Sequence, residues 1–389
     1  MFARVRQKNK LKIQLGDPLK EHMITQRIHR LRQDFAALFD TIVVLSDENR
    51  RYLSGYTGED GSYDETAGLL IITQNDLILA TDSRYDTQAR DEASQFTIHC
   101  CKESLTKELP GLLKSVNAHR VGIEESRLTY RLHQKFCEEI KKDQDLDIEF
   151  TQADDLLSSF RTRKDPEELM RIRAALTLAE KAFLKFRTHI HTGMTEREAA
   201  WLLEKTMREM GADGLSFPVI AASGPNSALA HAIPSDRQFK EGEPLLFDFG
   251  AKLDGYCSDT TRTLVIGEPD TRFKEIYDIL FQAQERAITA IAPHVAASDI
   301  DKVARDYIDA TAYNGTFGHS LGHGVGLAIH EEPRVSRLSS AILEPGMVIT
   351  VEPGIYLPQW GGIRLENMVV VTDTGAEVLN TMDYRDFRL

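Results

Sequence analysis

Four acidic residues and one histidine in the second half of the chain have types and spacings that suit a metal centre. Asp248 (in LLFDFG) is followed eleven residues later by Asp259 (in GYCSDTT). His323 (in HSLGHGVG), Glu352 (in TVEPG) and Glu366 (in GIRLE) come 64, 29 and 14 residues further on, each counted from the one before. Alone, a strand aspartate is usually a turn or cap residue and a lone histidine is usually structural, so the prediction depends on the set.

The set is informative because four carboxylates converging in apolar, glycine-flanked contexts would repel one another without cations. Two divalent ions remove this penalty, and bridging carboxylates hold such ions about 3.5–4 Å apart. Oxygen donors outnumber the single imidazole, which suits Mn²⁺, Mg²⁺ or Fe²⁺ better than a zinc site rich in cysteine and histidine. The sequence therefore predicts two divalent metal ions, with Mn²⁺ expected first and Co²⁺, Fe²⁺ or Zn²⁺ as alternatives.

The motifs together resemble the pita-bread (M24) metallopeptidase family, which includes methionine aminopeptidase, aminopeptidase P and prolidase. The segments GHGVG, HEEP, VEPGIY and GIRLE are similar to the Xaa-Pro branch of that family. In the first half, YLSGYTG (52–58) and TDSRY (81–85) resemble the extra N-terminal domain of aminopeptidase P and prolidase, which methionine aminopeptidase lacks. The resemblance covers the whole chain.

The resemblance implies a role for each ligand: Asp248 chelates one metal, Asp259 and Glu366 bridge both, and His323 and Glu352 complete the other. One departure is Asn367, where the family often has aspartate after the second glutamate. This position lies beside the ligands, so the departure concerns how the site is tuned rather than whether it binds metal.

Three further histidines fit the resemblance: His231 (in AHAIP), His319, and His330, which comes seven residues after the metal histidine. The family implies that all three line the substrate cleft, with His231 and His330 close to the scissile peptide bond. The alternative is that they are histidines hydrogen-bonded in a core. Ala230 also departs from the family, which often has proline before the cleft histidine.

Two arginines could serve the same cleft. Arg364 precedes Glu366 by two residues, so on a strand both side chains point to one face. We expect Arg364 to orient the metal carboxylates, with direct substrate contact as the alternative. Arg334 follows the HEEP turn; we expect a solvated surface arginine, with binding of a free C-terminal carboxylate as the alternative.

The predicted activity is removal of an N-terminal residue that precedes proline. Metal-activated water would attack the carbonyl of the first residue, with Glu352 as proton shuttle and His231 or His330 stabilising the oxyanion. Proline lacks an N–H, so its pocket should recognise ring shape. We favour an Xaa-Pro aminopeptidase, because of the YLSGYTG and TDSRY segments, over a prolidase restricted to Xaa-Pro dipeptides.

Two more distant functions are kept as alternatives. The creatinase branch uses the same fold on another small substrate without metals, and some pita-bread proteins have lost their metals and bind proteins or nucleic acids. The complete ligand set argues against both. HSLGH lacks the glutamate of the HExxH zinc motif, and GHGVG lacks the helix and spacing of a dinucleotide-binding loop.

The elements that must position these residues fall into two domains. In the first 160 residues, short β-rich runs at 41–45, 68–73 and 77–80 alternate with helical stretches such as 128–142. This predicts an α/β domain over 1–160, similar to the creatinase/prolidase N-terminal domain. The polar, acidic loop 54–65 is expected to be mobile.

The second domain, 161–389, is predicted to carry the pita-bread fold, so that the whole chain is of the α/β (α+β) class. Its first helix starts at Asp165-Pro-Glu-Glu, with aspartate as N-cap and proline in the first turn. A capping-box pattern at Thr195–Glu198 precedes a second helix. Further elements are listed by range: helices over 271–292 and 298–313, and strands over 347–352, 362–372 and near 377.

Composition limits the partners and the compartment. The 389 residues carry a net charge of −13, which argues against nucleic acid or an anionic membrane as a partner. The basic opening, 1–12, lacks the apolar stretch of a secretory signal, and we expect a frayed terminus there. The sequence contains no run of 18 consecutive apolar residues, so we expect no membrane-spanning helix.

The four cysteines show no CxxC spacing, so we expect reduced thiols and a cytoplasmic protein; they are Cys100, Cys101, Cys137 and Cys257. The family resemblance further implies a homodimer acting on peptides with proline in second position. In such a dimer the loop 54–65 could approach the partner's cleft, although a plain solvent loop fits its composition equally well.

Overall fold

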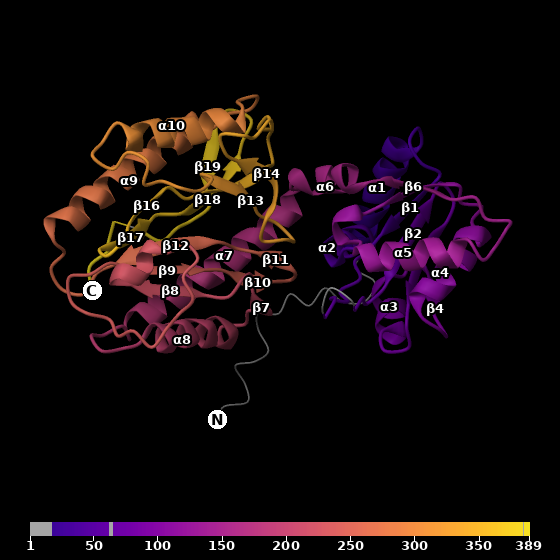
Figure 1. The fold of residues 1–389 in the computed structure, drawn as a ribbon, viewed down its shortest axis with the longest axis horizontal. Coiled ribbons are helices and arrows are strands. Elements are labelled where there is room, and N and C mark those ends of the chain that lie inside the picture. The colour runs from indigo at the N-terminus through magenta and orange to yellow at the C-terminus, as the bar shows by residue number, and fades with distance from the viewer. Residues whose placement is uncertain (1–17, 62–64, 384) are drawn as a thin grey trace. The chain divides into compact units, whose positions relative to one another are not determined.

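A computed structural model describes residues 18–61, 65–383 and 385–389 (Figure 1). The basic segment 1–12 lies outside the described residues. The chain divides into two compact units, Met1–Leu157 and Ser158–Leu389. The boundary predicted between residues 160 and 161 and the division after Leu157 both fall inside one helix, α6 (Asp154–Thr162).

The first unit is built on a six-stranded mixed sheet with the strand order β4-β3-β2-β1-β5-β6. The central strands β1 and β2 are antiparallel and buried along their whole length, because helices cover the sheet. The strands are β1 (Thr41–Val44), β2 (Leu69–Thr73), β3 (Leu77–Thr81), β4 (Thr97–Cys100), β5 (Arg120–Ile123) and β6 (Glu149–Gln152). The helices are α1 (Pro18–Phe35), α2 (Asp47–Ser54), α3 (Asp86–Glu92), α4 (Leu105–Ser115), the short η1 (Glu125–Arg127) and α5 (Tyr130–Ile140).

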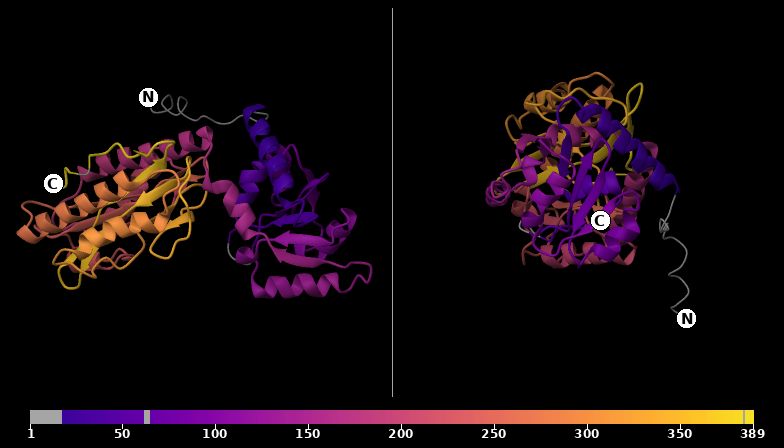
Figure 2. Two further views of the ribbon diagram at one scale, coloured as in Figure 1. Left: turned by 90° about the horizontal axis from the view of Figure 1, so that it is seen from above. Right: turned by 90° about the vertical axis from the view of Figure 1, so that its right-hand side faces the viewer.

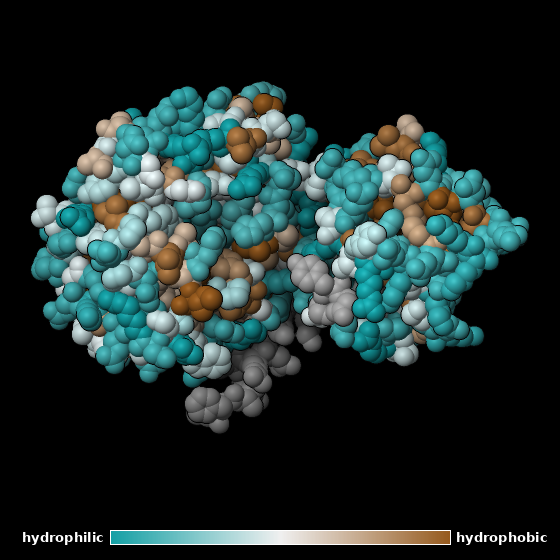
Figure 3. All heavy atoms as spheres, viewed as in Figure 1, coloured by the Kyte–Doolittle hydropathy of each residue, from teal (hydrophilic) through white to brown (hydrophobic). Residues whose placement is uncertain are grey.

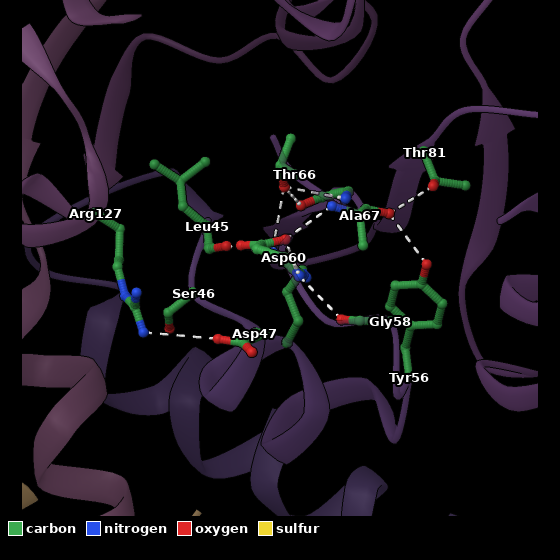
Figure 4. Close-up of polar contacts among 12 residues, drawn as sticks. Leu45, Ser46, Asp47, Tyr56, Gly58, Asp60, Thr66, Ala67, Thr81 and Arg127 are labelled. Carbon is green, nitrogen blue, oxygen red and sulfur yellow. Dashed lines mark hydrogen bonds and ion pairs between the residues drawn. The ribbon is translucent and has the colours of Figure 1, made fainter. Parts of the chain in front are cut away.

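The acidic loop between α2 and β2 is held by a buried arginine. Arg50 is completely buried, and its guanidinium pairs with Asp60 at 2.7 Å. The Asp60 carboxylate also accepts from the backbone N–H of Ala67 at 2.8 Å, and the Ala67 carbonyl accepts from the Tyr56 hydroxyl at 3.1 Å (Figure 4). The described part of this loop is therefore anchored to the unit, contrary to the predicted mobility.

The second unit consists of two halves, each with a pair of helices on a sheet. In the first half, α7 and α8 pack on the three-stranded sheet β12-β9-β8. In the second half, α9 and α10 lie side by side over the five-stranded sheet β14-β13-β15-β18-β19, as Figures 1 and 2 both show. Two smaller sheets, β11-β10-β7 and the hairpin β16-β17, complete the unit.

The helices of this unit are α7 (Pro166–Arg187), α8 (Glu196–Glu209), η2 (Gly224–Ala228), α9 (Thr271–Ala290) and α10 (Ala297–Asp309). The strands of the first half are β7 (Gly214–Leu215), β8 (Ile220–Ser223), β9 (Leu245–Phe249), β10 (Ala251–Leu253), β11 (Tyr256–Cys257) and β12 (Thr260–Leu264). Those of the second half are β13 (Gly322–Gly324), β14 (Glu331–Val335), β15 (Val348–Val351), β16 (Gly354–Leu357), β17 (Gly361–Arg364), β18 (Asn367–Val371) and β19 (Ala376–Val378).

Both predicted helix starts are confirmed as capping boxes. The Asp165 side chain accepts from the backbone N–H of Glu168 at 2.9 Å, and the Glu168 carboxylate accepts from the backbone N–H of Asp165 at 3.1 Å. Thr195 and Glu198 make the same reciprocal pair at the start of α8. These bonds satisfy N–H groups that have no partner inside a helix, which is why the four-residue pattern identifies the start.

One predicted strand, 362–372, is divided in the structure. Its first part is β17, which pairs with β16, and its second part is β18, which pairs with β15 and β19. The chain changes sheets at Leu365 and Glu366, whose backbone N–H groups donate to the carbonyls of Pro353 and Thr261, both at 3.3 Å. The break turns Glu366 toward the first half of the unit.

The aromatic core under β9 explains the orientation of its one acidic residue. Phe183 of α7 stacks on Phe249 with ring centroids 4.6 Å apart, and Phe186 meets Phe247 edge to face at 5.3 Å. Alternation along the strand therefore points Asp248 to the opposite face.

The surface visible in Figure 3 is mostly hydrophilic, with hydrophobic residues in small, separate groups. Among the described residues, no helix has the length and apolar character that crossing a membrane requires. All four cysteines lie in the described ranges and are free thiols, in agreement with the prediction.

Candidate metal centre

The five predicted ligands come from five different positions along the sheets of the second unit. Asp248 lies on β9, Asp259 directly precedes β12, His323 lies on β13, Glu352 directly follows β15, and Glu366 lies between β17 and β18. The antiparallel register of β9 and β12 sets Thr261 opposite Asp248, and the Thr261 hydroxyl donates to Glu366 at 2.7 Å. The hydrogen bond from Thr261 to Glu366 thus joins the two halves of the unit beside Asp248.

The distances show that the predicted ligands converge. His323 Nε2 lies 3.5 Å from Asp259 Oδ2 and 3.6 Å from Glu352 Oε1. One ligand atom each of Asp259, His323 and Glu366 lie within 4.8 Å of one another. Asp248 belongs to the same cluster, because its charge raises the pKa of both Asp259 and Glu366.

Close packing beside His323 accounts for the glycine that precedes it. An added Cβ on Gly322 would lie 2.0 Å from the backbone carbonyl oxygen of Thr350 on the adjacent strand. The Thr350 hydroxyl accepts from the backbone N–H of His323 at 3.1 Å and donates to Glu352 Oε1 at 3.3 Å. The glycine therefore lets β13 and β15 approach closely enough to bring the two ligands together.

The electrostatics of the cluster favour binding of cations. Burial raises the pKa of Asp259 and of Glu366 well above the usual range, and the neighbouring carboxylates add to the effect. Burial, with a contribution from the charge of Asp248, raises the pKa of Glu352 to about 8 even though Arg364 opposes the shift. Burial lowers the pKa of His323 to about 4, which leaves a neutral imidazole able to bind metal.

The donor set fits the two divalent ions predicted from sequence. Asp248 Oδ2 accepts from Arg364 Nη2 at 2.6 Å, whereas Asp248 Oδ1 is buried and has no hydrogen-bond partner among residues 18–61, 65–383 and 385–389. A buried carboxylate oxygen without a donor is costly, and a cation removes that cost. Four carboxylates and one imidazole match the preference of Mn²⁺-type ions for oxygen ligands.

Arg364 also connects the centre to the cleft. Its guanidinium is buried and donates to the Tyr356 hydroxyl at 2.8 Å and to the Ala230 carbonyl at 3.1 Å, besides its bond to Asp248. The Tyr356 hydroxyl lies 2.9 Å from His319 Nε2. This geometry favours the orienting role predicted for Arg364.

The three cleft histidines lie near the centre and near one another. The rings of His330 and His323 meet edge to face with centroids 4.3 Å apart. Burial lowers the pKa of His330, and the charge of His231 contributes to the same shift. Burial also lowers the pKa of His319 to about 4, with smaller contributions from Arg364 and His231. His231 itself is exposed, as a residue that meets substrate would be.

Asn367, the departure from the family pattern, lies beside the centre. Its side-chain oxygen accepts from Arg262 Nη2 at 3.1 Å. The same arginine donates to the backbone carbonyl of Glu366. Asn367 therefore helps to hold the chain at a ligand, and the neutral amide still accepts the bond that an aspartate would accept.

Sequence reasoning missed Gln284 of α9. Its side chain is completely buried, and Nε2 donates to the Val351 carbonyl at 2.7 Å and the Leu365 carbonyl at 3.0 Å. These carbonyls belong to the residues directly before Glu352 and Glu366. A signal existed, because helical spacing sets Gln284 on the apolar face of α9, where a polar side chain needs partners.

Arg334 and His319 line the same pocket. A cavity of about 500 Å³ is lined by residues that include His319, Ser320, Arg334 and Arg337. Arg334 is exposed, and its Nε donates to the Ser320 hydroxyl at 3.0 Å. Within the part of the chain that the structure describes, no carboxylate lies within ion-pair distance of its guanidinium, so this charge can meet a ligand.

Comparison with known proteins accounts for both units. Residues 170–373 match the model of Metallopeptidase family M24. The chain belongs to this family. Residues 27–162 match the Creatinase/Prolidase N-terminal domain. The predicted family and fold class are confirmed, and this M24 member is accordingly a peptidase of a metal-dependent family.

Several relatives match over nearly their full length. The Xaa-Pro dipeptidase of Pyrococcus horikoshii is 36% identical over 340 residues, which span 87% of this chain and 92% of the relative. The solved structure of an Xaa-Pro dipeptidase from Bacillus anthracis is 36% identical, with a TM-score of 0.87 and coverage of 94% of this chain and 100% of that chain. The structure of an X-Pro aminopeptidase from Thermotoga maritima is also 36% identical, with a TM-score of 0.82 and coverage of 93% and 100%.

Proposed function

We propose that this M24 member is an Xaa-Pro dipeptidase, which hydrolyses the bond between an N-terminal residue and a C-terminal proline. The observation that carries the peptidase chemistry is the clustering of four buried or half-buried carboxylates with one imidazole. The names of the relatives in Pyrococcus horikoshii and Bacillus anthracis support the dipeptide substrate. Because the X-Pro aminopeptidase from Thermotoga maritima is also similar to this chain, an Xaa-Pro aminopeptidase is the second candidate function.

This proposal reverses the preference drawn from sequence. The segments YLSGYTG and TDSRY favoured an aminopeptidase, yet both resemble an N-terminal domain that aminopeptidase P and prolidase share. They therefore separate either enzyme from methionine aminopeptidase and do not separate the two from each other. Several relatives are named Xaa-Pro dipeptidases or prolidases, which favours the activity that we gave as the alternative in the sequence analysis.

Arg334 supports recognition of a dipeptide by its C-terminus. An Xaa-Pro dipeptide ends in a carboxylate directly after the proline ring, and a guanidinium can bind such a carboxylate through two hydrogen bonds. Arg334 lines the cavity beside the cleft histidines, and its charge contributes to lowering the pKa of His323, after the larger effect of burial. We therefore assign Arg334 to the substrate carboxylate, in place of the surface role expected from sequence.

The metal-binding residues are proposed to be Asp248, Asp259, His323, Glu352 and Glu366. When bound, two divalent ions supply activated water and neutralise the charge that develops on the carbonyl oxygen. We keep Mn²⁺ as the ion expected from the oxygen-rich donor set.

The remaining steps are assigned to side chains. Hydrolysis adds the water oxygen to the carbonyl carbon, and a proton reaches the proline nitrogen as the C–N bond breaks. The Glu352 carboxylate would carry that proton, because it lies within the centre, with Oε1 3.6 Å from His323 Nε2. His231 and His330 would donate hydrogen bonds to the carbonyl oxygen, while Arg364 keeps Asp248 oriented.

The test compares Xaa-Pro, Xaa-Pro-amide and Xaa-Pro-Yaa peptides as substrates for the Mn²⁺-loaded protein. A dipeptidase should cleave Xaa-Pro far faster than the other two, and Arg334→Met should raise KM for Xaa-Pro about 10- to 100-fold, the loss of one charged contact. Arg173→Met is the matched control, because Arg173 pairs with Glu377 elsewhere on the unit. Rapid cleavage of Xaa-Pro-Yaa, unaffected by Arg334→Met, would instead establish the aminopeptidase.

A cytoplasmic location and a homodimer remain predictions. The free cysteines agree with a reducing compartment. Light scattering of the purified protein measures the oligomeric state directly.

A further inference from the structure

A buried glutamate lies under the loop that carries His231. Glu196 is the first residue of α8 and is completely buried. Its Oε1 accepts from the backbone N–H of Ser223 at 2.7 Å and from the Ser223 hydroxyl at 2.8 Å. Its Oε2 accepts from the Ser235 hydroxyl at 2.6 Å and from the backbone N–H of Ser235 at 3.1 Å, and Asn226 Nδ2 adds a bond at 3.1 Å.

The serine donors to Glu196 lie on either side of His231 in the sequence. Ser223 comes eight residues before the histidine and Ser235 four residues after it. One carboxylate therefore closes the loop at both ends. Bonds to an ionised acceptor are roughly twice as strong as bonds between neutral groups, so the closure is firm.

An ion pair reinforces the base of the loop. Arg237 donates through Nη1 to the Ser223 hydroxyl at 2.7 Å and forms a two-point pair with Glu243 at 2.6 and 2.7 Å. The backbone N–H of Arg237 donates to the Ser235 hydroxyl at 3.1 Å. Both serine hydroxyls thus donate to Glu196 and accept from Arg237, so their rotation is fixed.

The other side of the loop contacts β17 next to the metal centre. The Ala230 carbonyl, directly before His231, accepts from Arg364 at 3.1 Å. The Ser227 hydroxyl accepts from the backbone N–H of Gly362 at 2.8 Å. The loop is therefore held between Glu196 at its base and the strand that carries Arg364.

We propose that Glu196 is the positioning residue for His231: by fixing both ends of the loop, it sets the imidazole against the scissile peptide bond. The inference rests on the proposed function, in which His231 contacts the substrate carbonyl. Glu196 touches no substrate, and its effect on the reaction passes through the histidine.

The test uses Glu196→Gln, with Glu124→Gln as a matched control. Glu124 of the first unit is also buried and accepts from Ser46 N and Oγ, both at 2.8 Å, and from Asn49 Nδ2 at 2.6 Å. The two glutamates share the same types of donor, so the substitutions remove similar bonds. Only Glu196 holds a loop with a cleft histidine.

We expect Glu196→Gln to lower kcat about 10- to 100-fold with KM changed less, because a displacement of about 1 Å at a reacting group has effects of that size. Glu124→Gln should leave kcat unchanged. In a His231→Ala background, Glu196→Gln should cause no further loss, since its effect acts through the missing imidazole. Independent, multiplying losses in the double variant, or an unchanged kcat in Glu196→Gln or in His231→Ala, would overturn the inference.

A second measurement does not depend on activity. In metal-free protein with isotope-labelled histidine, the His231 imidazole signal is identified by its absence in His231→Ala. Glu196→Gln should shift or broaden this signal, and Glu124→Gln should leave it in place. If the wild-type protein cleaves no Xaa-Pro peptide, the proposed function fails, while this spectrum still decides whether Glu196 positions His231.

If Glu196→Gln does not fold, Ser235→Ala replaces it. This variant keeps the Glu196 carboxylate and removes the hydroxyl that donates to it at 2.6 Å and accepts from the backbone N–H of Arg237 at 3.1 Å. It should lower kcat about 3- to 10-fold, the size expected for one hydrogen bond, and move the His231 signal. Wild-type kcat together with an unmoved signal in Ser235→Ala would contradict the inference.

Discussion

The second unit buries carboxylates in two contrasting ways. Glu180 of α7 is surrounded by donors: it accepts from Asn380 Nδ2, from the backbone N–H and hydroxyl of Thr381, and from the backbone N–H of Met382. In the metal centre, Asp248 has one buried oxygen that receives no donor from the described residues. Glu366 accepts from the Thr261 hydroxyl and lies among other carboxylates.

Burial alone therefore does not distinguish a structural carboxylate from one that binds a ligand, because both kinds are buried. The distinguishing feature is the source of the compensating positive charge or donors. Glu180 and Glu196 find their donors within the chain, whereas the metal centre is proposed to take its compensating charge from bound cations. Substitutions at the two kinds of site should consequently affect different properties.

The largest effect is expected at the metal centre. Asp259→Asn removes one of the ligands proposed to bridge the ions, so activity should fall by about 10³-fold or more, equivalent to about 4 kcal/mol of transition-state stabilisation. Chelation of the wild-type protein should do the same and be reversed by Mn²⁺. Peptide hydrolysis with bound metal measured in parallel tests this, and an active, metal-free Asp259→Asn protein would remove the metal from the mechanism.

At Glu180, which is surrounded by donors, a substitution should lower the stability of the fold. Glu180→Gln exchanges an acceptor-only group for one whose amide faces the donors of residues 380–382, so the free energy of unfolding should fall by about 2–4 kcal/mol. Metal affinity should stay at the wild-type value. Chemical denaturation and metal titration of the same preparation separate the two, and a loss of metal affinity without a loss of stability would reverse the comparison.

Gln284 supports the metal centre from behind, so its replacement should have a moderate effect on metal affinity. Gln284→Leu removes two bonds to the carbonyls before Glu352 and Glu366, so metal affinity should fall about tenfold, the lower end of what residues behind metal ligands contribute. Calorimetric titration with Mn²⁺ measures it. Gln88→Leu, a helical glutamine in the first unit, serves as control, and equal affinities in all three proteins would show that Gln284 only supports the fold.

The sequence was sufficient for features whose determinants are local. Helix starts follow from four consecutive residues, as at Asp165 and Thr195, because the capping bonds join neighbours. The strands at Asp248 and Glu352 were identifiable because apolar residues flank each acid and a glycine follows two residues later, an unusual setting for a charged side chain. The face that Asp248 presents follows from simple alternation.

The remaining features depend on partners that the sequence keeps far apart. Glu196 meets donors 27 to 39 residues away, and Gln284 meets carbonyls 67 and 81 residues away. Only the folded sheets determine these distances, so a buried glutamate or glutamine looks like any surface residue beforehand. The division of the predicted strand 362–372 has the same origin, because Glu366 turns to meet Thr261 of another sheet.

A further effect concerns proton binding by a histidine near the metal centre. Burial, aided by the charge of Arg364, lowers the pKa of His319 from 6.5 to about 4 in the folded protein. Below pH 6.5 the unfolded chain binds a proton that the folded chain does not, so stability falls as the pH drops from 6.5 toward 4. At pH 5 the loss from this one group is about 2 kcal/mol at most, because each pKa unit corresponds to about 1.4 kcal/mol.

His319→Gln removes this proton and should make the loss of stability between pH 6.5 and 5 shallower by up to that amount. Chemical denaturation of the metal-loaded protein at pH 7, 6 and 5 measures the slope, and His22→Gln on the exposed surface of α1 is the control. Identical slopes in wild-type and His319→Gln proteins would mean that the imidazole is charged when folded. In that case the cation would lie beside Arg364, and the compensation at the cleft would have to come from the carboxylates of the metal centre.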